Sequence, residues 1–181
     1  MTPAEIQAAA AMLFEAEQSG VQCGLLSSAF PAMTLDEAYK VQAALIDKKL
    51  NSGLSIIGWK IGLTSRAMQQ ALNITTPDSG VLLDDMLFNS GDVIAAERFI
   101  QPRIEAEIAF VMKHDLKGDG VTREQIISAT DYVVPALEIL DTRILRADPK
   151  TGKARIIVDT VSDNAANAGI VLGNEKHAVL D

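Results

Sequence analysis

The stretch IQPRIEAEIAF, residues 100–110, limits the possible folds more than any other part of the chain. Successive side chains of a strand point to opposite faces, so isoleucine and alanine side chains share one face while Glu105 and Glu107 share the other. The two glutamates are roughly 7 Å apart along the backbone, from a rise of about 3.3 Å per residue. Burying both carboxylates without partners would cost several kcal/mol or force protonation. We therefore expect a cation between them or a face that is open to water.

The composition indicates a folded domain with an aliphatic core. The chain has 181 residues, of which 48% are hydrophobic and only 4% are aromatic. This length fits one domain or one domain with a small arm. The formal net charge of -8 disfavours nucleic acid as a partner, because nucleic-acid-binding domains carry basic patches. A small anionic substrate stays compatible, since the local charge of a site can oppose the net charge.

The cysteine content indicates a protein of a reducing compartment, and the histidine content disfavours a zinc site. The single cysteine, Cys23, cannot form an internal disulfide, which suits the cytoplasm. Two histidines, His114 and His177, are too few for a histidine-rich zinc site. Residues 1–18 lack the basic start of a signal peptide, and no apolar run approaches the roughly 20 residues of a membrane span. We therefore expect a cytoplasmic protein with no membrane partner.

Two helices are predicted for the N-terminal part of the chain. Thr2 with Glu5, and Thr34 with Glu37, each form a capping box that satisfies the first backbone N–H groups of a helix. Apolar residues at helical spacing follow both boxes. Glycines at positions 20 and 53 indicate where the helices end. We interpret residues 1–53 as an N-terminal helical arm.

The remaining residues, 54–181, are rich in predicted strands and form the expected catalytic domain. The predicted elements are a strand in 54–65, a short helix in 65–72, one or two strands in 81–94, a strand in 100–112, a helix in 123–130, a strand in 131–141 and a strand–turn–strand unit in 155–173. The segment 73–80, which contains Asp78, is predicted to be rich in turns. Helices followed by a strand-rich part indicate an α+β fold.

A third glutamate, Glu138, also lies in a predicted apolar strand. Taken alone, it could be a half-exposed strand residue or one partner of an ion pair. Together with Glu105 and Glu107 it forms a set of carboxylates without histidine or cysteine, which favours Mg²⁺ or Mn²⁺ over zinc. The three glutamates are therefore the candidate metal ligands.

Three further polar residues could carry chemistry, and each has a simpler interpretation. Lys60, which has a glycine two residues away on either side, could stabilise an enolate or donate a proton, or it could be a solvated strand lysine. Asp78 could act in a functional site, or it could be one of the aspartates that are common in turns. Ser162, in the run SDNAAN, could bind a polar substrate or form local hydrogen bonds within a turn. The chain has no G-x-S-x-G, P-loop or G-x-G-x-x-G motif, so serine hydrolase, NTPase and dinucleotide-binding functions have no support.

The order of five motifs resembles the hydratase/decarboxylase branch of the fumarylacetoacetate hydrolase superfamily, along almost the whole chain. The motifs are, in order, GWKIGLTS, TPDSG, QPRIEAEIAF, DYVVPALEILDTRI and DTVSDNAANAGIVLG. The resemblance implies a homo-oligomer whose subunit is a mixed β-roll with helices outside it, similar to the C-terminal domain of fumarylacetoacetase. It also implies a divalent cation, Mg²⁺ or Mn²⁺, held by Glu105, Glu107 and Glu138. Lys60 and Asp78 would be the catalytic residues.

The activity that this resemblance implies is the addition of water to a 2-oxo-enoate or dienol dicarboxylate in aromatic catabolism. The polar insert RADPKTGKARIIVDT favours the member of the branch that acts in the homoprotocatechuate (4-hydroxyphenylacetate) pathway. Ser162 would bind the 2-oxo acid substrate. Arg66 or Arg143 could bind the distal carboxylate, although Arg143 could equally pair with Asp141 or with a neighbouring strand.

Other activities stay open within the same resemblance. Decarboxylation of 4-oxalocrotonate and hydration of the monoacid 2-oxopent-4-enoate would use the same fold and metal. A non-catalytic subunit is the alternative from another class, and association with another enzyme of the pathway fits either case. Members of the branch continue for several dozen residues beyond the point that corresponds to residue 181, so we expect the roll to be truncated at its C-terminal end.

Overall fold

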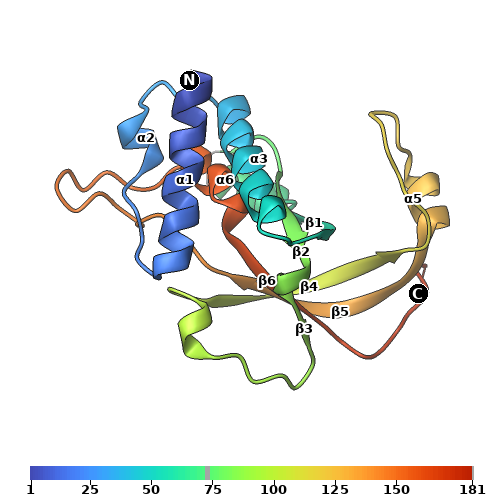
Figure 1. Ribbon diagram of the computed structural model, residues 1–181. Helices are drawn as coiled ribbons and strands as arrows, with labels where there is room; N and C mark the ends of the chain where they lie inside the picture. The colour runs from blue at the N-terminus through green and yellow to red at the C-terminus, as the bar shows by residue number, and fades with distance from the viewer. Residues whose placement is uncertain (72–73, 181) are drawn as a thin grey trace.

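The computed structural model of this protein, shown in Figure 1, describes residues 1–71 and 74–180. Its α-helices are α1 (Pro3–Ser19), α2 (Leu26–Ala29), α3 (Leu35–Asn51), α4 (Arg66–Ala71), α5 (Arg123–Ala129) and α6 (Ile157–Ser162). Its strands are β1 (Ile56–Gly62), β2 (Asp78–Leu83), β3 (Leu87–Asn89), β4 (Arg103–Met112), β5 (Thr130–Leu140) and β6 (Asn167–Leu172). Short 3-10 helices are η1 (Asp84–Met86), η2 (Ala96–Arg98) and η3 (Asn164–Ala166). The predicted α+β fold is confirmed.

Both N-terminal helices begin where their capping boxes predict. The Thr2 hydroxyl accepts a hydrogen bond from the Glu5 backbone N–H, and the Thr34 hydroxyl accepts one from the Glu37 backbone N–H. Helix α1 ends at Gly20, which adopts the left-handed conformation (φ 68°) that terminates many helices. These local signals therefore set where the two long helices begin and where α1 ends.

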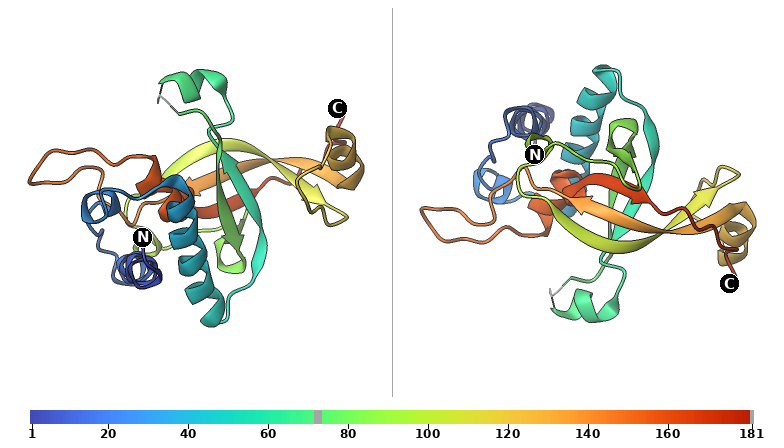
Figure 2. Two further views of the ribbon diagram at one scale, coloured as in Figure 1. Left: turned by 90° about the horizontal axis from the view of Figure 1, so that it is seen from above. Right: turned by 90° about the horizontal axis from the view of Figure 1, so that it is seen from below.

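The strands form two separate sheets. A four-stranded sheet has the order β3-β6-β5-β4, with β3 parallel to β6 and the other neighbours antiparallel. Strands β1 and β2 form an antiparallel ribbon of their own. Figure 2 shows this ribbon crossing the long β4 and β5 strands. Helices α1, α3 and α6 gather on one side of the four-stranded sheet (Figure 1).

The main hydrophobic core lies between the N-terminal helices and the segment around α6. Leu13 of α1 and Leu45 of α3 are fully buried in one cluster with Ile144 and Val161. The N-terminal helices therefore share a core with the later half of the chain. The proposed boundary at residue 53 stays a prediction.

Two sequence-based expectations for secondary structure are wrong. The stretch that begins at Arg155 was expected to be a strand, but Ile157–Ser162 is helix α6, which buries Val158 and Val161. The Asp159 carboxylate accepts the Ile156 backbone N–H at 3.0 Å at the start of this helix. Asp78 does not lie in a turn, because it is the first residue of strand β2.

Two short helices compare differently with the prediction. The short helix predicted for 65–72 corresponds to α4, and Leu72 lies outside the described residues. Helix α2 was not predicted, because its four residues are too few to show a periodic pattern.

Strand β4 lies at the edge of its sheet and exposes both faces. Ile104 and Ile108, on the face opposite the glutamates, are 57% and 66% exposed. The apolar residues of this stretch favoured a buried strand, but most of its side chains are exposed. None of the described helices combines the length and the apolar character needed to cross a membrane.

Candidate metal and catalytic site

The register between β4 and β5 brings the three predicted metal ligands together. Glu105 lies directly opposite Glu138, and Glu107 lies opposite Ala136. Directly opposed residues of an antiparallel pair share a face, with Cβ atoms about 4.5–5.5 Å apart, and the diagonal neighbours are within reach of long side chains. One carboxylate oxygen from each glutamate lies within 4.8 Å of the others.

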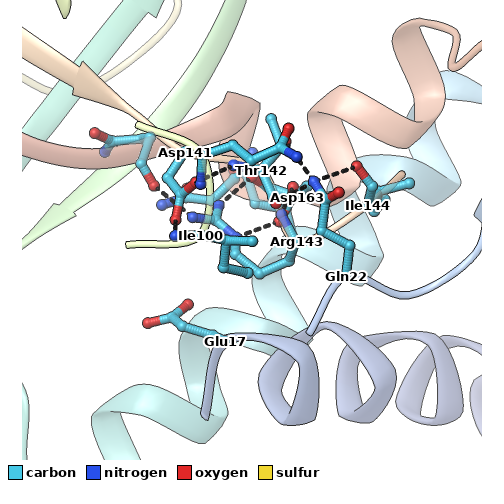
Figure 3. A network of polar contacts seen from close by, with 12 residues as sticks. Glu17, Gln22, Ile100, Asp141, Thr142, Arg143, Ile144 and Asp163 are labelled. Atoms are coloured by element: carbon cyan, nitrogen blue, oxygen red, sulfur yellow. Dashed lines mark hydrogen bonds and ion pairs between the residues drawn. The ribbon is translucent and has the colours of Figure 1, made fainter. Parts of the chain in front are cut away.

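Asp141 anchors the start of β4 to the end of β5. Its carboxylate accepts the backbone N–H of Ile100 at 2.8 Å and that of Gln101 at 2.7 Å (Figure 3). Asp141 follows β5 directly, and Ile100 and Gln101 precede β4. This contact holds the two strands at the ends nearest to the glutamates.

The three glutamates differ in burial. Glu138 is 7% exposed, whereas Glu105 and Glu107 are both exposed. Burial raises the pKa of Glu138, and the neighbouring charges of Glu105 and Glu107 raise it further, while Lys60 opposes both effects. Glu138 Oε1 is buried and has no hydrogen-bond partner among the described residues.

This arrangement fits a hard divalent cation. Oxygens on opposite sides of one Mg²⁺ or Ca²⁺ are roughly 4–5 Å apart, because metal–oxygen distances are about 2.1–2.5 Å. The observed separation of up to 4.8 Å lies in that range. A cation would also relieve the repulsion among the carboxylates. It would give the buried Glu138 oxygen, which makes no hydrogen bond among the described residues, a positive partner in addition to Lys60.

The β1–β2 ribbon places Lys60 and Asp78 next to this cluster. The Lys60 Nζ atom is 3.5 Å from Glu138 Oε1 and 3.9 Å from Asp78 Oδ1. The Lys60 and Asp78 side chains are only 13% and 6% exposed. Burial raises the pKa of Asp78, and the Lys60 ammonium and backbone N–H groups offset this only in part. The two predicted catalytic residues therefore lie together, beside one predicted metal ligand.

Amide side chains hold the edge of β2 that faces away from β1. Asn164 accepts the Val81 N–H at 2.7 Å and donates to the Val81 carbonyl at 2.9 Å, and Asn167 donates to the same carbonyl. Gln42 of α3 donates to the Ser79 carbonyl at 2.9 Å. These residues fix the strand that begins with Asp78.

The sequence contained a signal for one of these amides that was missed. Gln42 lies on the apolar stripe of α3, at helical spacing from Ala38 and Leu45, and it is buried. A polar residue on such a stripe indicates a specific hydrogen-bonding role. Asn164 and Asn167 belong to the run that was interpreted as substrate-binding or turn-forming, and both bind the β2 backbone.

Ser162 ends helix α6 and is fully buried. Its Oγ atom has no hydrogen-bond partner among the described residues. The Gln42 amide donates to the carbonyl of the preceding residue, Val161, as well as to Ser79, and so links α6 to β2.

The two arginines predicted to meet a distal carboxylate lie in different environments. Arg143 is 3% exposed, and its guanidinium binds the Asp163 carboxylate at 2.5 Å, the Asp163 carbonyl and the Asn167 carbonyl (Figure 3). The pairing partner is thus Asp163 rather than Asp141, and these bonds give Arg143 a structural role. Arg66 is exposed at the first position of α4.

Comparison with known proteins confirms the resemblance to the hydratase/decarboxylase branch of the fumarylacetoacetate hydrolase superfamily. Along 161 residues the chain is 47% identical to 2-oxo-hept-4-ene-1,7-dioate hydratase of Escherichia coli, covering 89% of this chain and 60% of that protein. It is 41% identical over 174 residues to 2-keto-4-pentenoate hydratase of Paraburkholderia xenovorans, covering 96% of this chain and 62% of that protein. No protein-family model matches the chain.

The fold is shared with a solved decarboxylase structure. The 4-oxalocrotonate decarboxylase from Pseudomonas putida G7, complexed with magnesium and adipate, superposes with a TM-score of 0.89 at 32% sequence identity. The match covers 99% of this chain and 66% of that structure. The chain spans about 60% of the length of the curated relatives that it matches.

Proposed function

We propose that this chain carries the catalytic site of a metal-dependent hydratase. The substrate is 2-oxo-hept-4-ene-1,7-dioate or its dienol form, and the product is 4-hydroxy-2-oxo-heptanedioate. The observation that carries the proposal is the convergence of Glu105, Glu107 and Glu138 beside Lys60 and Asp78. The identity of 47% to a hydratase of that name supports the choice of substrate.

Glu105, Glu107 and Glu138 would hold the cation, with Mg²⁺ proposed ahead of Mn²⁺. A divalent cation bound there supplies Lewis-acid polarisation of the 2-oxo group of the substrate. The magnesium in the related decarboxylase structure supports this choice of metal. The buried Oε1 of Glu138, which makes no hydrogen bond among the described residues, supports this residue as a ligand.

Asp78 and Lys60 are the proposed proton-handling residues. A raised pKa lets the Asp78 carboxylate take up a proton from carbon or water more readily than an ordinary aspartate would. The Lys60 ammonium, which lies between Asp78 and Glu138, would stabilise negative charge that develops on the substrate or return a proton to it. Loss of the 2-hydroxyl proton from the dienol and protonation at C5 would give the 2-oxo-3-ene form. In that form C4 is conjugated to the 2-oxo group and electrophilic, so water can add its oxygen at C4 while a proton is returned to C3.

Two further residues are proposed to bind the substrate. The buried Ser162 hydroxyl, which has no hydrogen-bond partner within the described part of the chain, is available for a hydrogen bond to the 2-oxo acid. The exposed Arg66 is available for the distal carboxylate. Arg143 is left out of this role, because its guanidinium is bound by Asp163.

The wider setting is part of the same proposal. We place the reaction in the cytoplasm, in the homoprotocatechuate (4-hydroxyphenylacetate) pathway, and expect the enzyme to form a homo-oligomer with a β-roll subunit. Association with another enzyme of that pathway is proposed on the same grounds. The names of the hydratase relatives support a role in aromatic catabolism.

Decarboxylation of 4-oxalocrotonate is the second candidate, and the TM-score of 0.89 to a decarboxylase favours it. Incubation with each substrate, with dienol absorbance and CO₂ release both followed, separates the two reactions. We expect loss of dienol absorbance without CO₂. Release of CO₂ from 4-oxalocrotonate at the greater kcat/KM would replace the hydratase assignment.

Substitution of one metal ligand tests the site directly. Glu107→Ala should abolish Mg²⁺-dependent turnover and leave the circular dichroism spectrum unchanged, because Glu107 is exposed and its loss creates no cavity. Glu124→Ala, at an exposed position of α5, is the control. Full wild-type activity in excess chelator would reject the metal assignment.

Asp78→Asn tests the proton-transfer role. The amide keeps the shape of the side chain but cannot accept a proton, so kcat should fall about 10²–10⁴-fold while KM changes little. Asp131→Asn, at an exposed position of β5, is the control. An unchanged kcat would remove Asp78 from the mechanism.

A further inference from the structure

The face of the β1–β2 ribbon that carries Lys60 and Asp78 has few other side chains, because most of its remaining positions are glycines. Its cross-strand pairs are Gly58 with Leu82, Lys60 with Gly80, and Gly62 with Asp78. The two charged side chains are therefore diagonal neighbours. The two positions next to both of them, Gly62 and Gly80, have no side chain.

The space over Gly62 is occupied by the two charged groups. A Cβ atom built on Gly62 would overlap Asp78 Oδ1 and would come within 3.0 Å of Lys60 Nζ. The same atom built on Gly58 would meet only Leu82 Cδ1, at an ordinary contact distance of 3.7 Å. Neither glycine adopts a positive φ, so the difference between these two positions is steric rather than conformational.

A methyl group at Gly62 therefore cannot fit unless the Asp78 carboxylate or the Lys60 ammonium moves. The Asp78 side chain is short and 6% exposed, so displacing Oδ1 displaces the whole carboxylate. The Lys60 ammonium contacts Glu138 as well as Asp78, so its displacement also changes the surroundings of the buried glutamate.

We propose that Gly62 is a positioning residue, whose missing side chain creates the space in which Lys60 and Asp78 lie together beside Glu138. This inference rests on the proposed function for its catalytic consequence. Its geometric part is independent of the reaction, because it concerns only the contact between position 62 and the charged pair.

The catalytic consequence is tested with Gly62→Ala and Gly58→Ala. Misplacing a reacting group by about 1 Å costs on the order of 100-fold in rate, so Gly62→Ala should lose about that factor in kcat with little change in KM. Gly58→Ala should keep the wild-type kcat. Equal effects of the two substitutions on kcat, or none at position 62, would overturn the proposal.

The geometric part is tested without any activity measurement. The change in unfolding free energy caused by Gly62→Ala is measured with Asp78 present and again in an Asp78→Ala background. We expect the alanine to destabilise the protein beside the carboxylate and to be tolerated without it, so the two substitutions are not additive. Additive effects would overturn the proposal. If the wild-type protein lacks hydratase activity, the proposed function is wrong. The comparison of unfolding free energies with and without Asp78 still decides the role of Gly62.

Discussion

Arg143 is buried and donates three hydrogen bonds to Asp163, one from its backbone N–H and two from its guanidinium (Figure 3). A fourth, also from the guanidinium, goes to the Asn167 carbonyl. From the sequence, the partner could equally be a substrate, Asp141 or a neighbouring strand. The choice depends on which acidic residue the fold brings close. Asp163 comes close because it follows helix α6, which the sequence did not predict. Charge alone therefore could not distinguish a binding arginine from a structural one.

Removal of this arginine should destabilise the fold. Arg143→Met leaves Asp163 buried without its cation, and breaking a buried pair in this way costs about 3–5 kcal/mol. Arg146→Met, at an exposed position, should change the unfolding free energy by less than about 0.5 kcal/mol. Urea unfolding of both variants measures the difference, and similar stabilities would contradict the structural role.

A second buried ion pair makes stability depend on pH. Glu17 Oε1 is 2.6 Å from the Nζ atom of Lys49, whose side chain is 3% exposed. Burial would raise the pKa of Glu17, but the Lys49 ammonium and the Arg143 guanidinium outweigh it, so the pKa lies below its ordinary value of 4.5. The ionised carboxylate therefore stabilises the fold above pH 4.5 and loses this effect as the pH falls through the folded pKa.

Glu17→Gln should lower the unfolding free energy at pH 7 by about 3 kcal/mol, the lower end of the range for broken buried pairs. The gap to the wild type should close as the pH falls below 4.5, because the wild-type carboxylate becomes neutral. Glu15→Gln, exposed on the same helix, is the control. A gap that is constant from pH 7 to pH 3 would refute the ion-pair explanation.

At the scale of elements, η3 is the most unusual segment. Asn164, Ala165 and Ala166 all have positive φ, between 53° and 60°. A non-glycine residue in this conformation is uncommon, and three in succession require support from their surroundings. The paired hydrogen bonds between Asn164 and Val81 supply that support, and the bare Cα of Gly80 lets the Asn164 carbonyl approach β2.

Loss of the hydrogen bonds between Asn164 and Val81 should lower the stability of the fold. Asn164→Ala leaves the partly buried Val81 N–H without its acceptor, at about 1–3 kcal/mol. Asn174→Ala, exposed beyond β6, should be near neutral. Thermal unfolding measures both, and equal unfolding temperatures would show that the Asn164 amide does not support the turn.

The elements with local signals were predictable, and those fixed by tertiary contacts were not. Capping boxes gave the starts of α1 and α3 from the sequence alone. Helix α6 has an apolar, β-branched start that is equally typical of a strand, and its packing into the core with α3 favours the helix.

The site residues also divide into those that local sequence patterns predict and those that tertiary contacts position. Alternation along the strand put Glu105 and Glu107 on one face, as found. The register that sets Glu138 opposite Glu105 could not be read from the sequence, because strand pairing is a tertiary property. The supporting contacts of Gln42 with Ser79 and Val161 also depend on the complete fold.

At the scale of the whole molecule, the site lies between two sheets that the helices hold in place. Strands β4 and β5 supply the glutamates, and the β1–β2 ribbon supplies Lys60 and Asp78 (Figures 1 and 2). A ligand that binds only the folded form stabilises it by about 2.7 kcal/mol at a hundredfold excess over its Kd. Mg²⁺ at that excess should therefore raise the unfolding free energy of the wild type by this amount and leave Glu107→Ala unchanged. An equal increase in both proteins would indicate binding elsewhere.

Calorimetric titration with Mn²⁺ is the most direct test that the three glutamates share one cation. We predict one Mn²⁺ per chain for the wild type and at least tenfold weaker binding for Glu138→Gln, which keeps the side-chain volume but removes an anionic ligand. Glu124→Gln should bind Mn²⁺ as the wild type does. Absence of Mn²⁺ binding by the wild type, or equal affinity in Glu138→Gln, would contradict the metal site.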